Sequence, residues 1–258
     1  MRIDLNCDMG ESFGAYTIGR DAEVMPFITS ANVACGFRAG DPRVMRRTIA
    51  LALRHGVAVG AHPGFPDLMG FGRREMKVDP GEIEDAVVYQ VGALAAMAAT
   101  QGARLQHVKA HGALYNMAAR DAALAEAIAR AVASVDRSLI LFGLPGSQLF
   151  EAGTRAGLPV AAEAFADRAY EPDGTLVSRT KSGAVIHDAR EVVARVVQMV
   201  CDGTVVAVDG SRIHLQASTI CTHGDTPGAE DLVRRIRAGL EAANVEVRPL
   251  GPTGEAAR

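Results

Sequence analysis

The chain has 258 residues, of which 48% are hydrophobic, so it can bury one sizeable core. Its formal net charge is −3 and its basic residues form no stripe, which argues against a nucleic acid or an anionic membrane as partner. The four cysteines lie far apart without a C-x-x-C pair, so neither a disulfide framework nor a zinc knuckle is predicted.

The amino-terminal residues read as a strand, without the basic start and apolar stretch of a signal peptide. No run approaches the ~20 apolar residues that a membrane span needs. These features predict a cytoplasmic protein with free thiols. We expect one barrel domain over residues 1–250 and a flexible tail over 251–258, where small and polar residues gather.

Short β-type runs alternate with Ala-rich helical runs along the whole chain, which is the pattern of repeated βα units. The predicted strands are 2–7, 28–35, 57–62, 105–110, 138–143, 159–163 and 213–221. The predicted helices lie near 42–55, 81–102, 121–135, 147–156, 188–202 and 228–243. Seven such strands favour a closed or nearly closed α/β barrel. An open doubly wound sheet is the alternative, but its nucleotide fingerprints, G-x-G-x-x-G and G-x-x-x-x-G-K-[ST], are absent.

The first strand has polar residues on one face and apolar residues on the other, because Asp4, Asn6 and Asp8 recur with period two. Barrel strands are normally apolar on both faces, and buried polar groups cost several kcal/mol unless they find partners. We favour a hydrated barrel interior in which these groups meet substrate. A hydrogen-bonded network, or a strand exposed on one side, remains the alternative.

Several polar residues are expected at the carboxyl ends of the strands, where barrel enzymes place their catalytic groups. Glu11 follows the first strand and could be a general acid or base, while a solvated loop glutamate is the competing account. The turn after the second strand could bring Asn32 and Arg38 to the barrel mouth. Asp41 is expected to cap the following helix.

His62 ends the third strand beside the Gly- and Pro-rich loop 63–80, which favours proton transfer near neutral pH over a purely structural role. In that loop, Arg73 or Arg74 could clamp a carboxylate. A second long loop, 164–187, is also expected to cover or build the site.

The fourth strand places His107, Lys109 and His111 on one face, where the lysine needs an anion such as Asp8 or a bound substrate group. Tyr115 and Asn116 follow in the same segment and are expected to contact substrate.

The last strand ends near His223 and Asp225, again a histidine and an aspartate where barrel enzymes place their reaction centre. Imidazoles and carboxylates could together hold a divalent metal, although no H-E-x-x-H helix or other tight spacing is present. The prediction therefore assigns no metal ligands and leaves a divalent metal as an open alternative.

With these segments in view, the sequence closely resembles the LamB/YcsF family. The segments that carry the resemblance are DLNCDMGE at 4–11, ANVACGF at 31–37, GAHPGFPD at 60–67, VKAHGALYN at 108–116 and ICTHGD at 220–225. The segments 163–170 and 176–179 extend it, which marks the loop 164–187 as part of the site. One position departs: Arg38 stands where the family pattern has histidine, and arginine can neither act as a base nor bind a cation at neutral pH.

The resemblance implies a distorted seven-stranded barrel related to glycoside hydrolases and polysaccharide deacetylases. It also implies ATP-dependent opening of 5-oxoproline to glutamate, together with B and C subunits. Because the chain lacks a phosphate cradle, ATP is expected on the partner subunits. A metal-dependent carbohydrate deacetylase and a non-catalytic protein that binds a small acid are the alternatives.

Overall fold

Seven parallel strands close into a barrel in the computed structural model, which describes residues 1–223 and 228–251. In barrel order they are β1 (Arg2–Met9), β2 (Ser30–Ala34), β3 (Ala58–His62), β4 (His107–Val108), β5 (Ile140–Gly143), β6 (Val160–Phe165) and β9 (Thr219–His223). The barrel closes where β9 pairs with β1, with Asp4 opposite Thr219 and Asp8 opposite His223. The predicted seven-stranded α/β barrel is confirmed. The barrel is uneven, because β4 has only two residues.

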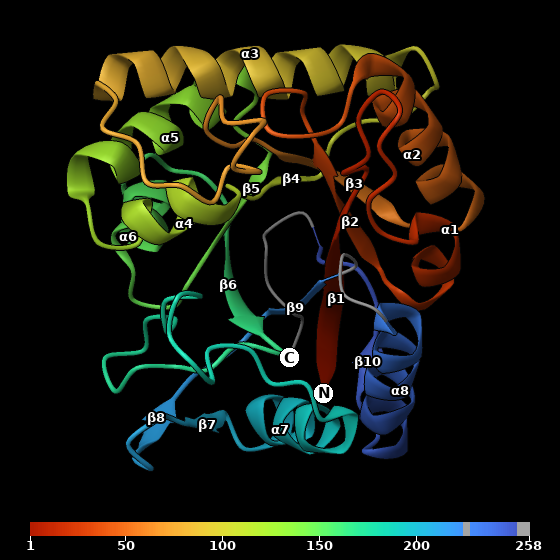
Figure 1. The fold of residues 1–258 in the computed structure, drawn as a ribbon, viewed down its shortest axis with the longest axis vertical. Helices are drawn as coiled ribbons and strands as arrows, with labels where there is room; N and C mark the ends of the chain where they lie inside the picture. Colours follow the sequence, from red (N-terminus) through yellow and green to blue (C-terminus); the bar gives the residue numbers. More distant parts are fainter. Residues whose placement is uncertain (224–227, 252–258) are drawn as a thin grey trace.

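Helices surround the strands, and Figure 1 shows the long α3 running across one side of the barrel while α7 and α8 cover the opposite side. The helices are α1 (Asp21–Val24), the 3-10 helix η1 (Met25–Phe27), α2 (Pro42–Arg54), α3 (Pro80–Ala99), α4 (Gly112–Ala118), α5 (Ala122–Val135), α6 (Gln148–Arg155), α7 (Ala189–Cys201) and α8 (Ala229–Ala242). Asp41 caps α2 by accepting hydrogen bonds from the amides of Arg43 and Val44, as expected. No helix in the described ranges has the length and apolarity that crossing a membrane requires.

The prediction of one strand over 213–221 was wrong. The segment contains β8 (Arg212–His214), which pairs antiparallel with β7 (Thr204–Val206) as a separate two-stranded sheet, and only then β9. Its alternating apolar residues continue from Ile213 through Leu215 to Ala217, so local pattern gives no sign of the break. A further short strand, β10 (Glu246–Val247), pairs with the start of β1.

One face of β1 is apolar and the other is polar, as its sequence predicts. Its apolar residues belong to the main core between strands and helices, namely Ile3, Leu5, Cys7 and Met9. Its polar residues, Asp4, Asn6 and Asp8, are also buried, but their partners lie inside the barrel, on β2, β6 and β9 and on Lys109, which follows β4. The barrel interior is therefore polar along this side, and the apolar core lies outside it.

A small apolar cluster fills the rest of the interior near the amino-terminal ends of β5 and β6. It consists of Ile140, Phe142, Ala161 and Leu250. The ring of His107 stacks on Phe142 with centroids 4.3 Å apart. Leu250 follows β10, so the segment directly after β10 closes this end of the barrel, and the open end lies at the carboxyl ends of the strands. Residues 252–258, which include most of the predicted tail, lie outside the described ranges.

Candidate functional site

Asp4 lies deepest on the polar face of β1 and is held by hydroxyl groups. Its Oδ1 accepts hydrogen bonds from Thr29 (2.7 Å) and Ser30 (2.6 Å), and its Oδ2 accepts one from Thr219 (2.5 Å). Burial raises the pKa of Asp4 to about 6, although these hydroxyls oppose the shift. Both carboxylate oxygens are occupied within the barrel, so the geometry gives Asp4 a structural role and not the expected contact with substrate.

Asn6 forms the next layer and connects several strands. Its amide donates to Thr219 (2.7 Å) and Glu163 (3.1 Å), and its Oδ1 accepts from Asn32 (2.7 Å). Asn32 in turn accepts a hydrogen bond from Nε2 of His107 at 2.8 Å. Asn6 and Asn32 are fully buried, so the lower interior is a direct hydrogen-bonded network and not the hydrated space we expected. We assign both residues to positioning the layer above.

Gly60 makes room for this network. A Cβ atom at Gly60 would lie 2.0 Å from Nε2 of His107, so any side chain there would displace the imidazole. The absence of a side chain at this position of β3 therefore allows His107 to reach Asn32 across the interior.

Asp8 and Lys109 form the centre of the upper layer. The Lys109 ammonium lies 2.9 Å from Asp8 Oδ1, 3.1 Å from Glu163 Oε1 and 2.9 Å from Cys221 Sγ. Burial lowers the pKa of Lys109, but its anionic neighbours outweigh burial and hold the pKa well above its ordinary value. Burial likewise raises the pKa of Asp8, but His62 and Lys109 outweigh it and hold that pKa well below its ordinary value. The predicted pairing of Lys109 with Asp8 is present.

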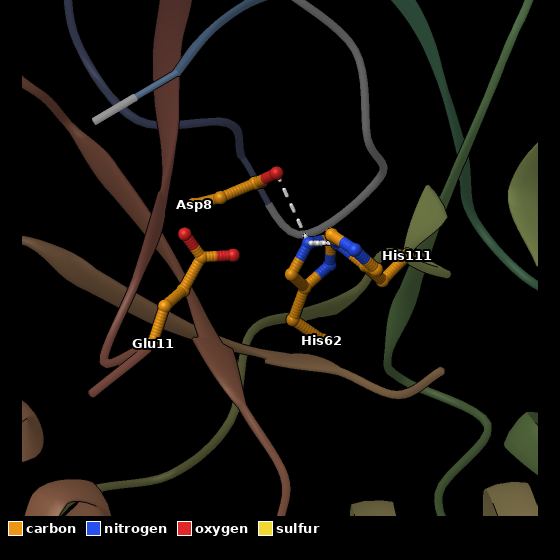
Figure 2. A group of neighbouring side chains, drawn as sticks. All are labelled: Asp8, Glu11, His62 and His111. Atoms are coloured by element: carbon orange, nitrogen blue, oxygen red, sulfur yellow. Dashed lines mark hydrogen bonds and ion pairs between the residues drawn. The ribbon is translucent and has the colours of Figure 1, made fainter. Parts of the chain in front are cut away.

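His62 and His111 lie beside Asp8 with their rings edge to face, and Figure 2 shows the side chains of Asp8, Glu11, His62 and His111 converging. Nε2 of His62 is 3.1 Å from Asp8 Oδ2 and 3.0 Å from Nδ1 of His111. Burial lowers the pKa of His62 to about 4, although Asp8 opposes the shift. Burial and Arg38 also lower the pKa of His111 well below its ordinary value. Both imidazoles are therefore neutral near pH 7.

Glu11 and Arg38 form a buried ion pair at the edge of this group, with 2.6 Å between Oε1 and Nη1. The Arg38 guanidinium also lies over the ring of Phe71, 5.0 Å from its centroid. Arg38 is fully buried, so the residue at which the sequence departs from the pattern we expect is part of the site's interior. It neutralises Glu11 and contributes a fixed positive charge.

His223 belongs to a second polar group at the barrel mouth. Its Nδ1 donates to Asp167 at 2.9 Å, and Arg179 donates to its Nε2 at 2.9 Å. Burial raises the pKa of Asp167, but His223 and Arg179 outweigh it and hold the pKa below its ordinary value. Asp225, the other site residue predicted at the end of this strand, lies outside the described residues.

Two adjoining cavities open above this layer. The inner one, of about 40 Å³, has room for about two or three water molecules. Its lining includes the side chains of Asp8, His62, Lys109, His111, Tyr115 and His223. The outer one measures about 710 Å³, and residues that line both are Arg73, Gly112, Asn116, Leu176 and Arg179. We call the passage between the two cavities the neck. The predicted loops 63–80 and 164–187 thus supply its two arginines, Arg73 and Arg179.

Arg73 and Arg74, either of which could clamp a carboxylate by sequence alone, have different surroundings. Arg74 pairs with the buried Asp67, with 3.0 Å between its Nε and Asp67 Oδ1. Arg73 lines both cavities and lies over the Phe71 ring, 5.0 Å from its centroid. The choice of Arg73 as the residue that faces substrate fits this placement.

Three members of the site were not singled out individually from the sequence: Glu163, Asp167 and Arg179. Glu163 had a visible signal, because it is the only charged residue in the apolar run of β6 (Val160–Phe165). Burial raises the pKa of Glu163 although Lys109 opposes the shift. Asp167 and Arg179 lie in a long loop, where sequence pattern does not indicate which side chains point inward.

Comparisons with known proteins place this architecture among related chains. The profile of the LamB/YcsF family matches residues 3–255. The A subunit of a 5-oxoprolinase from Symbiobacterium thermophilum is 58% identical over 246 residues, covering 95% of this chain and 94% of the relative. The crystal structure of a lactam utilization protein from Thermus thermophilus superposes with a TM-score of 0.92 at 48% identity, covering 97% of this chain and all of that one (100%).

A more distant likeness concerns the fold alone. The catalytic domain of a peptidoglycan N-acetylglucosamine deacetylase from Eubacterium rectale has a TM-score of 0.50 at 14% identity, covering 99% of this chain and 92% of that domain. The predicted relationship to the deacetylase type of barrel is confirmed at the level of architecture.

Proposed function

The chain belongs to the LamB/YcsF family, and on this basis we propose that it is the A subunit of an ATP-dependent 5-oxoprolinase. Its relatives carry the name of the A subunit of 5-oxoprolinase, and that name implies an assembly of several chains. In this proposal the B and C subunits bind ATP, the assembly acts in the cytoplasm, and the barrel described here opens the lactam ring of 5-oxo-L-proline to give L-glutamate.

The proposed reaction begins with activation, because a five-membered lactam is a resonance-stabilised amide. The γ-phosphoryl group of ATP moves to the lactam oxygen on the partner subunits and ADP leaves. In the barrel, water adds to the activated carbon, the carbon–nitrogen bond breaks, and the nitrogen takes up a proton. The resulting γ-glutamyl phosphate is then hydrolysed by a second water to glutamate and inorganic phosphate.

The observation that carries the proposal is the arrangement of charge from the neck to the interior. Arg73 and Arg179 line the neck, where they can hold the carboxylate of 5-oxoproline or the transferred phosphoryl group. Below them, the ammonium of Lys109 can stabilise negative charge that develops on the attacked carbon's oxygen. Tyr115, Asn116 and His223 complete the walls around the substrate.

The titratable side chains below the neck carry out the proton transfers. His62, His111, Asp8 and Glu11 lie within 4.8 Å of one another through their ligand atoms, and the first three line the inner cavity, where they can reach a water. Neutral imidazoles can accept a proton from the attacking water, and ionised carboxylates can hold it until the ring nitrogen leaves.

The decisive experiment measures glutamate formation from 5-oxoproline and ATP by B and C subunits with this chain added or omitted. We expect glutamate only when all three are present. The Arg73→Ala variant should lower kcat/KM about 10- to 150-fold, the cost of losing a hydrogen bond to a charged group. Arg74→Ala, which removes the neighbouring arginine that pairs with Asp67, is the matched control and should keep its rate.

The alternatives give different results in the same experiment. Acetate release from an N-acetylated sugar without ATP would identify a carbohydrate deacetylase, the function suggested by the distant fold likeness. Binding of 5-oxoproline by the chain alone, with an unchanged rate for Asp8→Ala or His111→Ala in the reconstituted enzyme, would identify a non-catalytic acid-binding protein. Either result would overturn the proposal.

A further inference from the structure

The two imidazoles at the base of the inner cavity are fixed by main-chain carbonyls. Nδ1 of His62 lies 2.7 Å from the carbonyl oxygen of Lys109, and Nε2 of His111 lies 2.9 Å from that of Phe71. A carbonyl oxygen only accepts hydrogen bonds, so each of these nitrogens carries the ring proton. In a neutral ring the other nitrogen then has a lone pair. Those two nitrogens, His62 Nε2 and His111 Nδ1, face each other at 3.0 Å.

Asp8 contributes a third acceptor atom, Oδ2, beside these two nitrogens. Its Oδ1 is occupied by Asn32 and Lys109, each at 2.9 Å. Its Oδ2 lies 3.1 Å from Nε2 of His62. Three acceptor atoms from β1, β3 and the segment after β4 therefore converge, and their mutual repulsion requires a positive charge between them.

We propose that Asp8, His62 and His111 bind one divalent first-row transition metal ion, such as Mn²⁺, Fe²⁺, Co²⁺ or Zn²⁺. Two histidines and one carboxylate on one side of an ion form a recognised triad that leaves the remaining positions open. Neighbouring ligands 3.0 and 3.1 Å apart fit an ion about 2.1 Å from each donor. Imidazole donors favour these metals over Mg²⁺ and Ca²⁺, which prefer oxygen ligands.

The surroundings of the triad support the same conclusion. Each ligand is oriented by a second contact, which is typical of metal sites: the Lys109 and Phe71 carbonyls for the histidines, Asn32 for Asp8. The Phe71 backbone adopts φ of 56°, a left-handed conformation that a phenylalanine rarely takes. The inner cavity above the triad provides space for water or substrate at the open positions.

Two carboxylates beside the triad share one ammonium, because Lys109 pairs with both Asp8 and Glu163. A divalent cation at Asp8 adds positive charge to this group and attracts an anionic substrate. Glu11 belongs to the same cluster, but Arg38 binds its Oε1, so we place Glu11 beside the ion as a proton acceptor and not as a fourth ligand. With the ion bound, the lone pairs of His62 and His111 are used for coordination, so Glu11 takes over the proton transfer that these imidazoles would otherwise perform.

A second group of possible ligands is less suitable. Asp8, Cys221 and His223 also lie within 4.8 Å of one another. However, the Lys109 ammonium already lies 2.9 Å from both Asp8 Oδ1 and Cys221 Sγ, so a cation occupies the space between them. The site is therefore assigned to the histidine pair.

The test measures metal binding on the full chain and does not depend on 5-oxoprolinase activity. The purified protein is analysed for metal by mass spectrometry, stripped with a chelator, and titrated with Co²⁺ while its visible absorption is followed. We expect about one ion per chain and Co²⁺ absorption bands of histidine and carboxylate coordination. His62→Gln and His111→Gln should each weaken Co²⁺ binding at least about 100-fold.

Control variants separate this site from others. His55→Gln and His214→Gln remove exposed histidines and should leave Co²⁺ affinity unchanged. Loss of binding in His223→Gln with retention in His62→Gln would place the ion in the second group and overturn the assignment. A folded wild-type chain that neither retains metal nor binds Co²⁺ would also overturn it, because a shared proton would then supply the positive charge. The wild-type titration keeps the test valid even if a variant fails to fold.

Discussion

Replacing Lys109 with methionine tests whether the buried ion pairs hold the barrel interior together. Methionine preserves much of the length of the side chain but removes the ammonium, which lies 2.9 Å from Asp8 and 3.1 Å from Glu163. Both carboxylates would then remain in the interior without their cation. A pair whose lysine is exposed, Lys181 with Glu171 at 2.9 Å, provides the matched control through Lys181→Met.

The magnitude follows from the distances. At an effective dielectric constant of about 20, each pair contributes about 5–6 kcal/mol of Coulomb attraction. Desolvation of each buried ion offsets several kcal/mol of this, so removing one partner should lower the free energy of unfolding by about 3–5 kcal/mol. For a chain of this size, that loss lowers Tm by about 6–20 °C. The control lysine is exposed, so its pair should contribute less than about 1 kcal/mol.

Urea unfolding and calorimetry of the two variants measure the difference. In a double variant, Glu163→Gln should recover part of the loss caused by Lys109→Met, with a coupling of about 0.5–3 kcal/mol, because one of the stranded carboxylates is gone. If Lys109→Met costs no more than Lys181→Met, the ion pairs do not stabilise the interior and the reasoning is refuted.

Three further substitutions probe the supports of the site. The pKa of Asp4 is raised to about 6, so its favourable contribution is complete below its ordinary pKa of 3.8 and is lost as pH rises through 6. Asp4→Asn should therefore gain about 2 kcal/mol relative to the wild type between pH 4 and pH 8, and parallel urea-unfolding profiles at both pH values would contradict this. Gly60→Ala should cost about 1–3 kcal/mol in thermal unfolding because the new methyl group displaces His107, whereas Gly92→Ala, in an open helical position, should slightly stabilise the chain. Asp41→Ala removes the α2 cap and should cost about 1 kcal/mol, and an unchanged urea midpoint would show that the cap contributes nothing.

The barrel could be predicted because it depends on local periodicity. Alternating residues define β1, and Asp-Pro starts mark the beginnings of α2 and α3. The elements that were missed are short or depend on distant partners: α4 has seven residues, and β8 forms only because β7 lies beside it. Local sequence does not determine such pairings.

The site was predictable where a polar residue interrupts an apolar strand. Asp8, His62 and Lys109 stand out in this way, and the structure brings them together. What sequence could not supply is the distance between residues on different strands. The pairing of Arg38 with Glu11 and the convergence of two imidazole nitrogens on Asp8 depend on how the barrel closes.

The closure of β9 against β1 has a consequence for how the protein is made. Asp4 and Thr219, which share a hydrogen bond, are 215 positions apart, so the ribosome must add 215 residues after Asp4 before the partner emerges. Until then, a barrel assembled from the earlier strands would enclose the Asp4 carboxylate and the Asn6 amide without the Thr219 hydroxyl that both of them contact. The nascent chain should therefore remain collapsed without fixed tertiary structure until β9 pairs with β1. The pocket should form in the same late step that completes the fold.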